Sequence, residues 1–302
     1  MNHYTRRQMF LASAIAPLLR GATLQQVRLS VTTDEIDEDL RTAAIFLHQH
    51  GLGYAELRSL WGKYNTSYPV EKVREAKALL DEYQLKTSIV DTTVFRGPLP
   101  PDTAEGKLTI AGQLKLLDDA MTRATILGTD KLRIFAFLYK SGETPDNSHY
   151  PRIYELLSEA ARRAKARGIR LAVENLANSY VWTGAQAGEM LKAVHEDNLG
   201  LTWDPNNAAE KGETPFPDGF RHLDPARIFH VHVRDFRRRP DGKVEWTAVG
   251  EGEFDNTGHI RALLKAGYKE VFNLETHWRG PGGKAASTET SLAGLIKAIE
   301  RV

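Results

Sequence analysis

The sequence predicts an α/β protein with the fold of a single (β/α)₈ barrel, and three observations lead to this prediction. From residue 25 onward, short apolar runs rich in β-branched and aromatic residues alternate with amphipathic, helix-like segments. There are eight such runs, and strands that alternate with helices pair in parallel. The 302 residues, 41% of them hydrophobic, can bury one large core, and barrels of this kind take about 250 residues.

The eight expected strands are short and end near polar or charged residues. They are Val27–Val31, Tyr54–Leu57, Thr87–Val90, Lys131–Phe135, Arg170–Val173, Gly200–Trp203, Ile228–Val233 and Glu270–Leu274. The helical segments between them are Val70–Tyr83, Lys107–Leu127, Tyr150–Arg167, Gly184–His195 and Asn256–Ala266. Gly51, Gly128, Gly168 and Gly267 stand just before strands two, four, five and eight, where a left-handed residue ends a helix.

A doubly wound, nucleotide-binding sheet is the alternative to a barrel. The sequence has no Gly-x-Gly-x-x-Gly after the first expected strand and no Gly-x-x-x-x-Gly-Lys-Ser/Thr loop, so that alternative lacks its main support. Two proline-containing stretches, 96–106 and 208–222, are expected to be long loops at the carboxyl ends of strands. We therefore expect one domain over residues 25–302.

The first 24 residues differ from the rest of the chain. The pair Arg6-Arg7 precedes the apolar stretch 12–19, which is typical of an export signal. Phe10 and Leu11 behind the pair favour the twin-arginine route, although the phenylalanine stands one residue later than usual. We expect residues 1–24 to be this signal and the protein to be periplasmic or secreted. The alternative is a lead-in helix of a cytoplasmic enzyme.

Composition excludes several classes of partner and cofactor. The net charge of +1, with one dense basic run at 234–239, does not fit a nucleic-acid-binding protein. No stretch after the signal-like segment reaches the ~18 apolar residues that a membrane span needs. The absence of cysteine excludes thiolate zinc sites and iron–sulfur clusters.

Four metal-capable side chains stand at the ends of the last four expected strands: Glu174, Asp204, His232 and Glu275. Successive members are roughly 30 to 40 residues apart, the length of one strand–helix unit. The carboxyl ends of barrel strands meet at one face, so we expect these side chains to converge on one divalent metal ion. Carboxylate and imidazole ligands suit Mn²⁺, which we expect, and also Mg²⁺, Co²⁺ or Zn²⁺.

His230 and His232 share one strand face, because side chains alternate along a strand. His232 is nearer the carboxyl end of the strand, so we expect it to be the ligand. His230 is then expected one layer deeper, in a supporting or substrate-binding role.

Five motifs resemble, in order, those of the xylose-isomerase-like TIM-barrel superfamily of sugar phosphate isomerases and epimerases. They are Val173-Glu174-Asn175, Trp203-Asp204-Pro205-Asn206, His230-Val231-His232-Val233-Arg234-Asp235, Gly250-Glu251-Gly252-Glu253-Phe254-Asp255 and Leu274-Glu275. The resemblance covers residues 25–302. It implies a metal-dependent TIM barrel that acts on a ketose, keto-sugar or inosose. The metal ligands would be Glu174, Asp204, His232 and Glu275, and the two glutamates would also be the catalytic acid–base pair.

Proton transfer in such a site has a simple physical logic. Removing a proton next to a carbonyl creates an enediolate, whose charge a chelating metal ion stabilises. Two carboxylates on opposite sides of the sugar can remove one proton and return another.

A dehydratase or lyase of a keto-sugar or inosose would use the same intermediate. An endonuclease-IV-like phosphodiesterase is less expected, because the earlier strand ends at Thr32, Ser59, Asp91 and Phe135 lack the histidines of a multi-zinc cluster.

Further candidates are expected to bind a small carbohydrate substrate: Asn207, Arg238, His230, Glu56, Trp246 and His277. Asn207 stands where the free-ketose epimerases that the sequence resembles carry histidine, which leaves the substrate open. Trp246 offers an aromatic wall for the apolar face of a sugar. Barrels of this kind often pair, so a homodimer is a further expectation.

Overall fold

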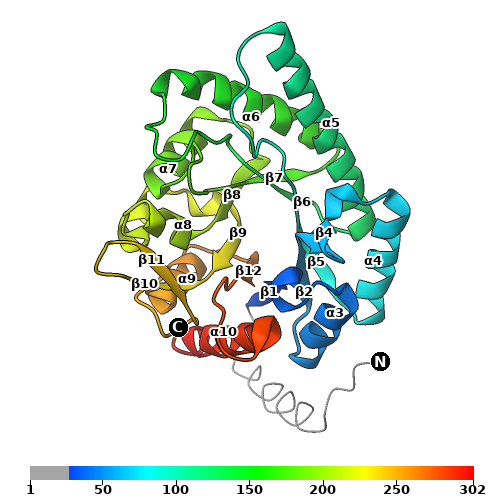
Figure 1. Cartoon of the computed structure of the whole chain (residues 1–302), viewed down its shortest axis with the longest axis vertical. Helices are drawn as coiled ribbons and strands as arrows, with labels where there is room; N and C mark the ends of the chain where they lie inside the picture. Colours follow the sequence, from blue (N-terminus) through cyan, green and yellow to red (C-terminus); the bar gives the residue numbers. More distant parts are fainter. Residues whose placement is uncertain (1–26) are drawn as a thin grey trace.

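The structure, a computed structural model, describes residues 27–302. Within them, eight parallel strands close into one barrel in the order β1-β12-β9-β8-β7-β6-β5-β2, and helices surround it (Figure 1). The predicted fold class is therefore confirmed. The expected export signal, residues 1–24, lies outside the described residues, and it and the homodimer stay predictions. In the described part of the chain, no helix has the length and apolar character to cross a membrane.

The barrel strands agree with the predicted ones to within one residue at each end. They are β1 (Arg28–Thr32), β2 (Tyr54–Leu57), β5 (Lys86–Asp91), β6 (Lys131–Ile134), β7 (Arg170–Glu174), β8 (Leu199–Trp203), β9 (Ile228–Val233) and β12 (Val271–Leu274). Two small antiparallel hairpins extend from the barrel, β3 (Ser59–Leu60) with β4 (Lys63–Tyr64) and β10 (Asp235–Arg238) with β11 (Val244–Thr247). The sequence analysis did not predict either hairpin.

The five predicted helices are all present, among nine in the described part of the chain. The α-helices are α2 (Thr33–Ile36), α3 (Leu40–Gln49), α4 (Val70–Glu82), α5 (Ala104–Leu127), α6 (Tyr150–Lys165), α7 (Gly184–Ala193), α8 (Pro205–Glu210), α9 (Asn256–Lys265) and α10 (Gly283–Glu300). Short helical turns cover Asn65–Ser67, Asn147–His149, Pro215–Gly219, Phe220–His222 and Pro225–Arg227. Helix α10 was missed because serine, threonine and glycine, which are weak helix formers, fill much of it. Burial of Leu292, Leu295 and Ile296 against the barrel stabilises it instead.

The four glycines predicted to end helices all have left-handed backbone conformations, with φ between 69° and 86°. Gly128 shows why: its N–H reaches back to the carbonyl oxygens of Ala124 and Thr125 at the end of α5. Each glycine turns the chain from a helix into the next strand.

Alternation along the strands gives the barrel two different faces. Residues such as Leu29 and Val31 face outward and belong to the large apolar core between strands and helices. In β1 the alternate residues Ser30 and Thr32 face the barrel axis and are polar: Ser30 donates to Asn273 Oδ1 at 2.6 Å, and Asn273 donates to Thr32 Oγ1 at 2.8 Å. The core therefore lies outside the strands, and the interior is available for hydrogen-bonding and ionic groups.

The loop that contains Gly250 and Gly252 is anchored by Asp235, at the start of β10. Its carboxylate accepts the backbone N–H groups of Gly250, Gly252 and Phe254 at 2.8, 3.2 and 3.1 Å. A Cβ at Gly252 would lie 2.1 Å from Asp235 Oδ1, so only glycine fits there. This motif therefore shapes the loop that follows the β10–β11 hairpin.

His259 in α9 is a buried histidine at a distance from the barrel interior. Its ring packs against Phe216, Phe220 and Phe254, with centroids 5.3 to 5.7 Å apart, and its Nε2 has no hydrogen-bond partner among the residues that the structure describes. Burial lowers the pKa of His259 from its ordinary value of 6.5 to about 3. The folded protein therefore keeps this ring neutral at pH values where the unfolded chain is protonated.

We expect His259→Phe to reduce the acid sensitivity of the fold. The neutral His259 ring contributes its full stabilisation of the fold above pH 6.5. This stabilisation is lost as the pH falls toward 3, because the unfolded chain binds a proton at His259 that the folded chain does not. When the pH is lowered from 7 to 5, the free energy of unfolding should fall in both proteins, and the fall should be about 2 kcal/mol smaller in the variant than in wild type. Urea unfolding at both pH values measures this. The exposed His195→Phe variant is the control, and equal pH sensitivity of His259→Phe and wild type would contradict the prediction.

Candidate active site

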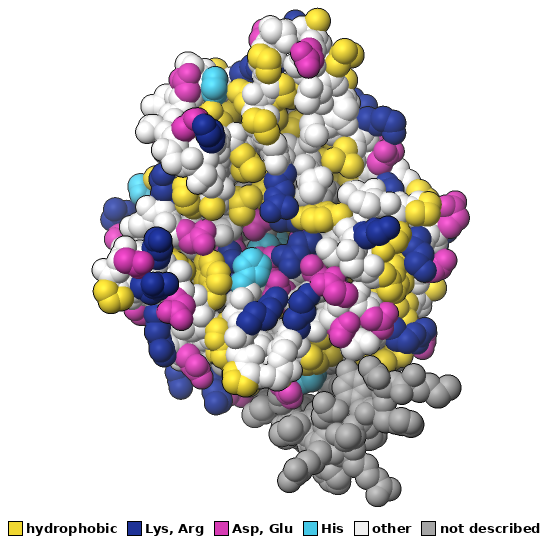
Figure 2. Space-filling view, in the orientation of Figure 1, with side chains coloured by type: hydrophobic (Ala, Val, Ile, Leu, Met, Phe, Trp, Pro, Cys, Tyr) yellow, Lys and Arg dark blue, Asp and Glu magenta, His cyan; other side chains and the backbone are white. Residues whose placement is uncertain are grey.

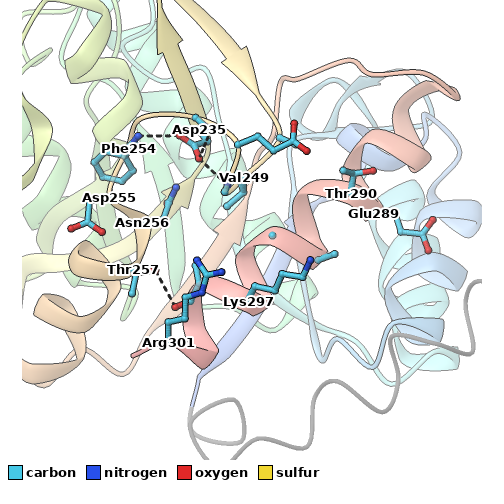
Figure 3. Close-up of a pocket in the computed structure, with 17 residues that line it drawn as sticks. Asp235, Val249, Phe254, Asp255, Asn256, Thr257, Glu289, Thr290, Lys297 and Arg301 are labelled. Atoms are coloured by element: carbon cyan, nitrogen blue, oxygen red, sulfur yellow. Dashed lines mark hydrogen bonds between the residues drawn. The ribbon is translucent and has the colours of Figure 1, made fainter.

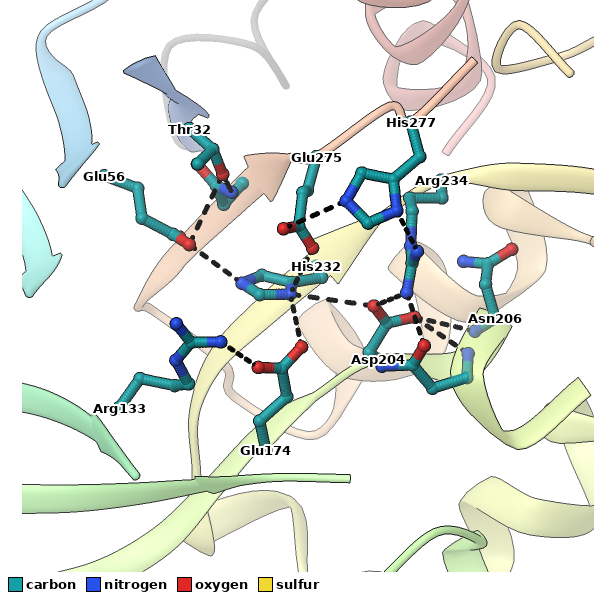
Figure 4. Close-up of polar contacts among 12 residues, drawn as sticks. Thr32, Glu56, Arg133, Glu174, Asp204, Asn206, His232, Arg234, Glu275 and His277 are labelled. Atoms are coloured by element: carbon teal, nitrogen blue, oxygen red, sulfur yellow. Dashed lines mark hydrogen bonds and ion pairs between the residues drawn. The ribbon is translucent and has the colours of Figure 1, made fainter. Parts of the chain in front are cut away.

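Four side chains from four strand ends meet inside the carboxyl end of the barrel. They are Glu174 at the end of β7, Asp204 after β8, His232 in β9 and Glu275 after β12 (Figure 4). All four are buried, and one ligand atom of each lies within 4.8 Å of the others. The structure thus brings together the four residues that the sequence singled out.

The Nδ1 atom of His232 is the centre of this cluster. It lies 3.1 Å from Glu275 Oε2, 3.4 Å from Glu174 Oε1 and 3.6 Å from Asp204 Oδ2, and among residues 27–302 it has no partner in hydrogen-bonding geometry. The surrounding carboxylates raise the pKa of His232 well above its ordinary value, although burial alone would lower it. Three oxygens and one nitrogen around a strongly negative point fit a divalent cation.

The other nitrogen of His232 is fixed by Glu56, which projects from β2. Nε2 lies 3.0 Å from Glu56 Oε1, and the second oxygen of Glu56 lies 2.5 Å from His230 Nε2. With a cation in place of the Nδ1 proton, Nε2–H would donate to Glu56 and the Nδ1 lone pair would face the cation, as in carboxylate–histidine–metal arrangements.

The predicted substrate contacts of Glu56 and His230 are corrected by this geometry. Both side chains have zero exposure and bond to each other, and Glu56 lies on the side of the His232 ring away from the other carboxylates (Figure 4). The expected deeper position of His230 is confirmed. Both residues support His232 and do not face the mouth of the barrel.

Three arginines outside the set of predicted site residues each contact one carboxylate of the cluster. Arg58 donates to Glu275, Arg133 to Glu174 and Arg234 to Asp204. Arg58 stands two residues after Glu56 and Arg234 two after His232, so the alternation of side chains could have placed both on the inner face. Arg133 is a charged residue between the apolar Leu132 and Ile134 of its strand, which is also a signal of a polar interior.

Two of these arginines help to keep their glutamate partners, Glu174 and Glu275, ionised in spite of their burial. Burial alone would raise the pKa of Glu174, but Arg133 and His232 lower it to about 2. In the same way, His277, His232 and Arg58 hold the pKa of Glu275 well below its ordinary value. The cluster is therefore negatively charged at neutral pH, which a cation site requires.

Asn175 holds the ends of β7 and β8 in register. Its Nδ2 donates to the carbonyl oxygens of Asp204 and Trp182 at 2.7 and 3.1 Å, and its Oδ1 accepts the Asp204 N–H at 2.8 Å. Its own carbonyl accepts from Asn207 Nδ2 at 2.8 Å. Asn207 Oδ1 in turn accepts from Arg234 at 2.7 Å. The two asparagines therefore place Asp204 against the cluster.

Trp246 and His277 lie at the mouth, beside the cluster. The Arg234 guanidinium lies 4.5 Å from the Trp246 ring centroid and donates to His277 Nδ1 at 2.8 Å. His277 Nε2 lies 3.3 Å from Glu275 Oε1. The backbone of His277 has a φ of 49°, which is rare outside glycine and concentrates at functional sites.

Arg238 does not contact the cluster, and its predicted substrate contact stays a prediction. Its guanidinium donates to the carbonyl oxygens of Ala209 and Glu213, both at 3.1 Å. These contacts tie the β10–β11 hairpin to the end of α8. Arg238 is a brace between two loops.

Two surface features help to locate the site. Figure 2 shows a hollow in the centre of the face drawn in Figure 1, with basic, acidic and histidine side chains around it. A separate cavity of about 680 Å³ lies outside the barrel, between residues 248–257 and α10 (Figure 3). No group of converging metal ligands was found in that cavity among the described residues. The cluster at the carboxyl end of the barrel is therefore the candidate active site.

Comparison with known proteins identifies the family. The family model described as xylose isomerase-like TIM barrel matches residues 45–298. The chain belongs to this family. The family resemblance predicted from the five motifs is thereby confirmed.

Individual relatives are more distant. An inosose isomerase from Bacillus velezensis is 28% identical over 126 residues, which is 40% of this chain and 44% of that protein. A 3-dehydroshikimate dehydratase from Pseudomonas putida is 27% identical over 151 residues, 48% of this chain and 22% of that protein. The match thus spans less than half of the length of either curated relative.

Solved structures agree with the fold. The IolI protein, solved with a zinc atom, aligns with a TM-score of 0.72 and 18% identity over 90% of this chain and 98% of its own. An L-ribulose 3-epimerase aligns with a TM-score of 0.69 and 17% identity over 90% and 95%. At such low identity these likenesses establish the fold.

We expect Asn175→Ala to destabilise the protein by about 2–4 kcal/mol, because it leaves buried backbone groups of Asp204 without partners. Chemical denaturation measures the loss. Asn206→Ala is the matched control: Asn206 is equally buried, but its side-chain amide has no hydrogen-bond partner in the described part of the chain. A similar loss in both variants would show that Asn175 does not act through these hydrogen bonds.

Proposed function

We propose that this protein is a divalent-metal-dependent isomerase or epimerase of a sugar or keto-sugar. The observation that carries the proposal is the convergence of three buried carboxyl groups on Nδ1 of His232, which has no hydrogen-bond partner among residues 27–302. The names of the relatives, an inosose isomerase and an L-ribulose 3-epimerase, support the same class of reaction.

Glu174, Asp204, His232 and Glu275 would hold the ion. When bound, it supplies Lewis-acid stabilisation of the negative charge that develops on the carbonyl oxygen of the substrate. We propose Mn²⁺ because three oxygen donors and one imidazole suit it, and Mg²⁺, Co²⁺ and Zn²⁺ meet the same donor set. Elemental analysis distinguishes among them.

Glu174 and Glu275 are the proposed acid–base pair. They project from β7 and from the end of β12, on two sides of His232 (Figure 4). Both are ionised at neutral pH, so either can accept the proton next to the substrate carbonyl. In an isomerisation, the glutamic acid formed in this way would return that proton to the neighbouring carbon. In an epimerisation, the opposite glutamate would first take a proton from solvent and then give it to the same carbon from the other face. Arg133 and Arg58 hold the two carboxylates in place while this happens.

A dehydratase or lyase is the second candidate. The partial match to a 3-dehydroshikimate dehydratase favours it, and both reactions begin with removal of a proton next to a carbonyl. They differ in whether a hydroxyl group leaves after that step. Product analysis by NMR separates them, since only elimination forms a new carbon–carbon double bond.

We expect the purified wild-type protein to contain about one equivalent of divalent metal. His232→Ala should lose it, because this change removes the nitrogen at the centre of the cluster. His230→Ala should keep it, since His230 reaches the cluster only through Glu56. Elemental analysis after reconstitution with Mn²⁺ measures both variants. A wild-type protein that binds no metal would refute the proposed function.

Glu275→Gln tests the acid–base role separately from metal binding. The amide keeps one oxygen for the metal but cannot accept the substrate proton, so proton exchange should fall by about 10²- to 10⁴-fold while part of the metal stays bound. NMR in deuterated water follows exchange at the carbon next to the carbonyl of ketohexoses and an inosose. Glu300→Gln, at the exposed end of α10, is the control. Near-normal exchange in Glu275→Gln would remove this residue from the proposed role.

A further inference from the structure

We propose that Arg96 binds an anionic terminus of the sugar substrate, a carboxylate or a phosphate, at the mouth of the barrel. This inference rests on the proposed function of the metal-ligand cluster, and it defines the class of sugar that the site accepts. It follows from the position of Arg96, from its lack of an ionic partner and from the way its backbone is held.

The position of Arg96 follows from the alternation of side chains at the end of β6. Arg133 faces the barrel interior and contacts Glu174, whereas Ile134 packs in the outer core. Phe135 then points inward again, is fully buried and does not belong to the outer core. The Arg96 guanidinium lies 5.5 Å from the Phe135 ring centroid and that of Arg133 lies 4.6 Å from it. Only one aromatic ring therefore separates Arg96 from the arginine that holds Glu174.

Arg96 differs from the inner arginines in its charge balance. Arg133 is paired with Glu174 and Asp91, Arg234 with Asp204, and Arg58 with Glu275, Asp34 and Glu35. Arg96 is exposed, and its side chain has no ion pair or hydrogen bond with any of the residues 27–302. A guanidinium at the mouth thus keeps its charge and its five N–H donors for a ligand.

The backbone around Arg96 is held firmly against β6. The N–H of Phe95 donates to Gln113 Oε1 at 2.9 Å, and the N–H groups of Phe135 and Phe137 donate to the carbonyls of Val94 and Phe95, both at 3.0 Å. Phe95 and Phe137 both have positive φ angles, 60° and 56°, and their rings stack with centroids 4.6 Å apart. Such conformations persist only where the surroundings enforce them, and they concentrate at functional sites.

A guanidinium matches the two oxygens of a carboxylate or phosphate, and this pairing is stronger than a hydrogen bond to a neutral hydroxyl. A sugar whose carbonyl end lies at the cluster would direct its other end toward the exposed guanidinium of Arg96, which lies next to the buried Phe135 ring. An uncharged ketose would leave Arg96 without a partner. The site is therefore suited to a keto-sugar with an acidic end.

The test compares three ligands that share one carbon skeleton: D-fructuronate, D-fructose 6-phosphate and D-fructose. Calorimetry on the Mn²⁺-loaded full-length protein measures binding, and NMR measures solvent-proton exchange. One or both anionic sugars should bind about 10- to 100-fold more tightly than fructose. Arg96→Gln should remove that advantage and leave fructose binding unchanged, and Arg96→Lys should restore part of it. The anionic sugar whose tighter binding is lost in Arg96→Gln shows whether the terminus is a carboxylate or a phosphate.

Arg74→Gln is the matched control, because Arg74 is an exposed arginine of the outer helix α4. Anionic sugars that bind no better than fructose would overturn the proposal, and so would an equal loss of all three ligands in Arg96→Gln. Arg96-dependent binding of an anion without proton exchange would uphold the role of Arg96 and refute the proposed isomerase function. The failures of the two proposals are thus distinguishable.

Discussion

Repulsion among buried carboxylates is the constraint around which the carboxyl end of this barrel is organised. Glu174, Asp204 and Glu275 face one imidazole nitrogen at 3.1 to 3.6 Å, where little water screens their charges. Each contacts an arginine from another part of the barrel, so that β2, β6 and β9 supply the positive charges that β7, β8 and β12 need. A divalent ion among the carboxylates would complete this balance. The ion pairs therefore join distant strands and prepare the cation site at the same time.

The closed parallel barrel makes this concentration of charge possible. Its apolar core lies between strands and helices, which leaves the interior for polar side chains such as Ser30, Thr32 and Asn273. Glu56 lies below the cluster and fixes the orientation of His232, while Asn175 joins the backbone ends of β7 and β8. Such support restricts the ligand atoms to a small volume, as a catalytic site requires.

The loops above the cluster connect this rigid centre to a substrate. Arg234 contacts a metal-ligand candidate, the Trp246 ring and His277, so it links the interior to the mouth. On another side of the mouth, Arg96 covers Phe135 and has no acidic partner in the described chain. The proposed chemistry takes place at the cluster, and the residues at the mouth are proposed to determine which substrate binds.

The sequence by itself determined the eight barrel strands, the four converging ligand candidates and the deeper position of His230. These features follow from local periodicity and from the rule that barrel strands end at one face, so a single sequence contains them. Only the tertiary structure decided that Arg58, Arg133 and Arg234 pair with the cluster, that Arg238 braces two loops, and that α10 is a helix. The arginine pairs join residues 30 to 217 positions apart. Their partners depend on barrel register and on side-chain direction, and neither is specified within one strand.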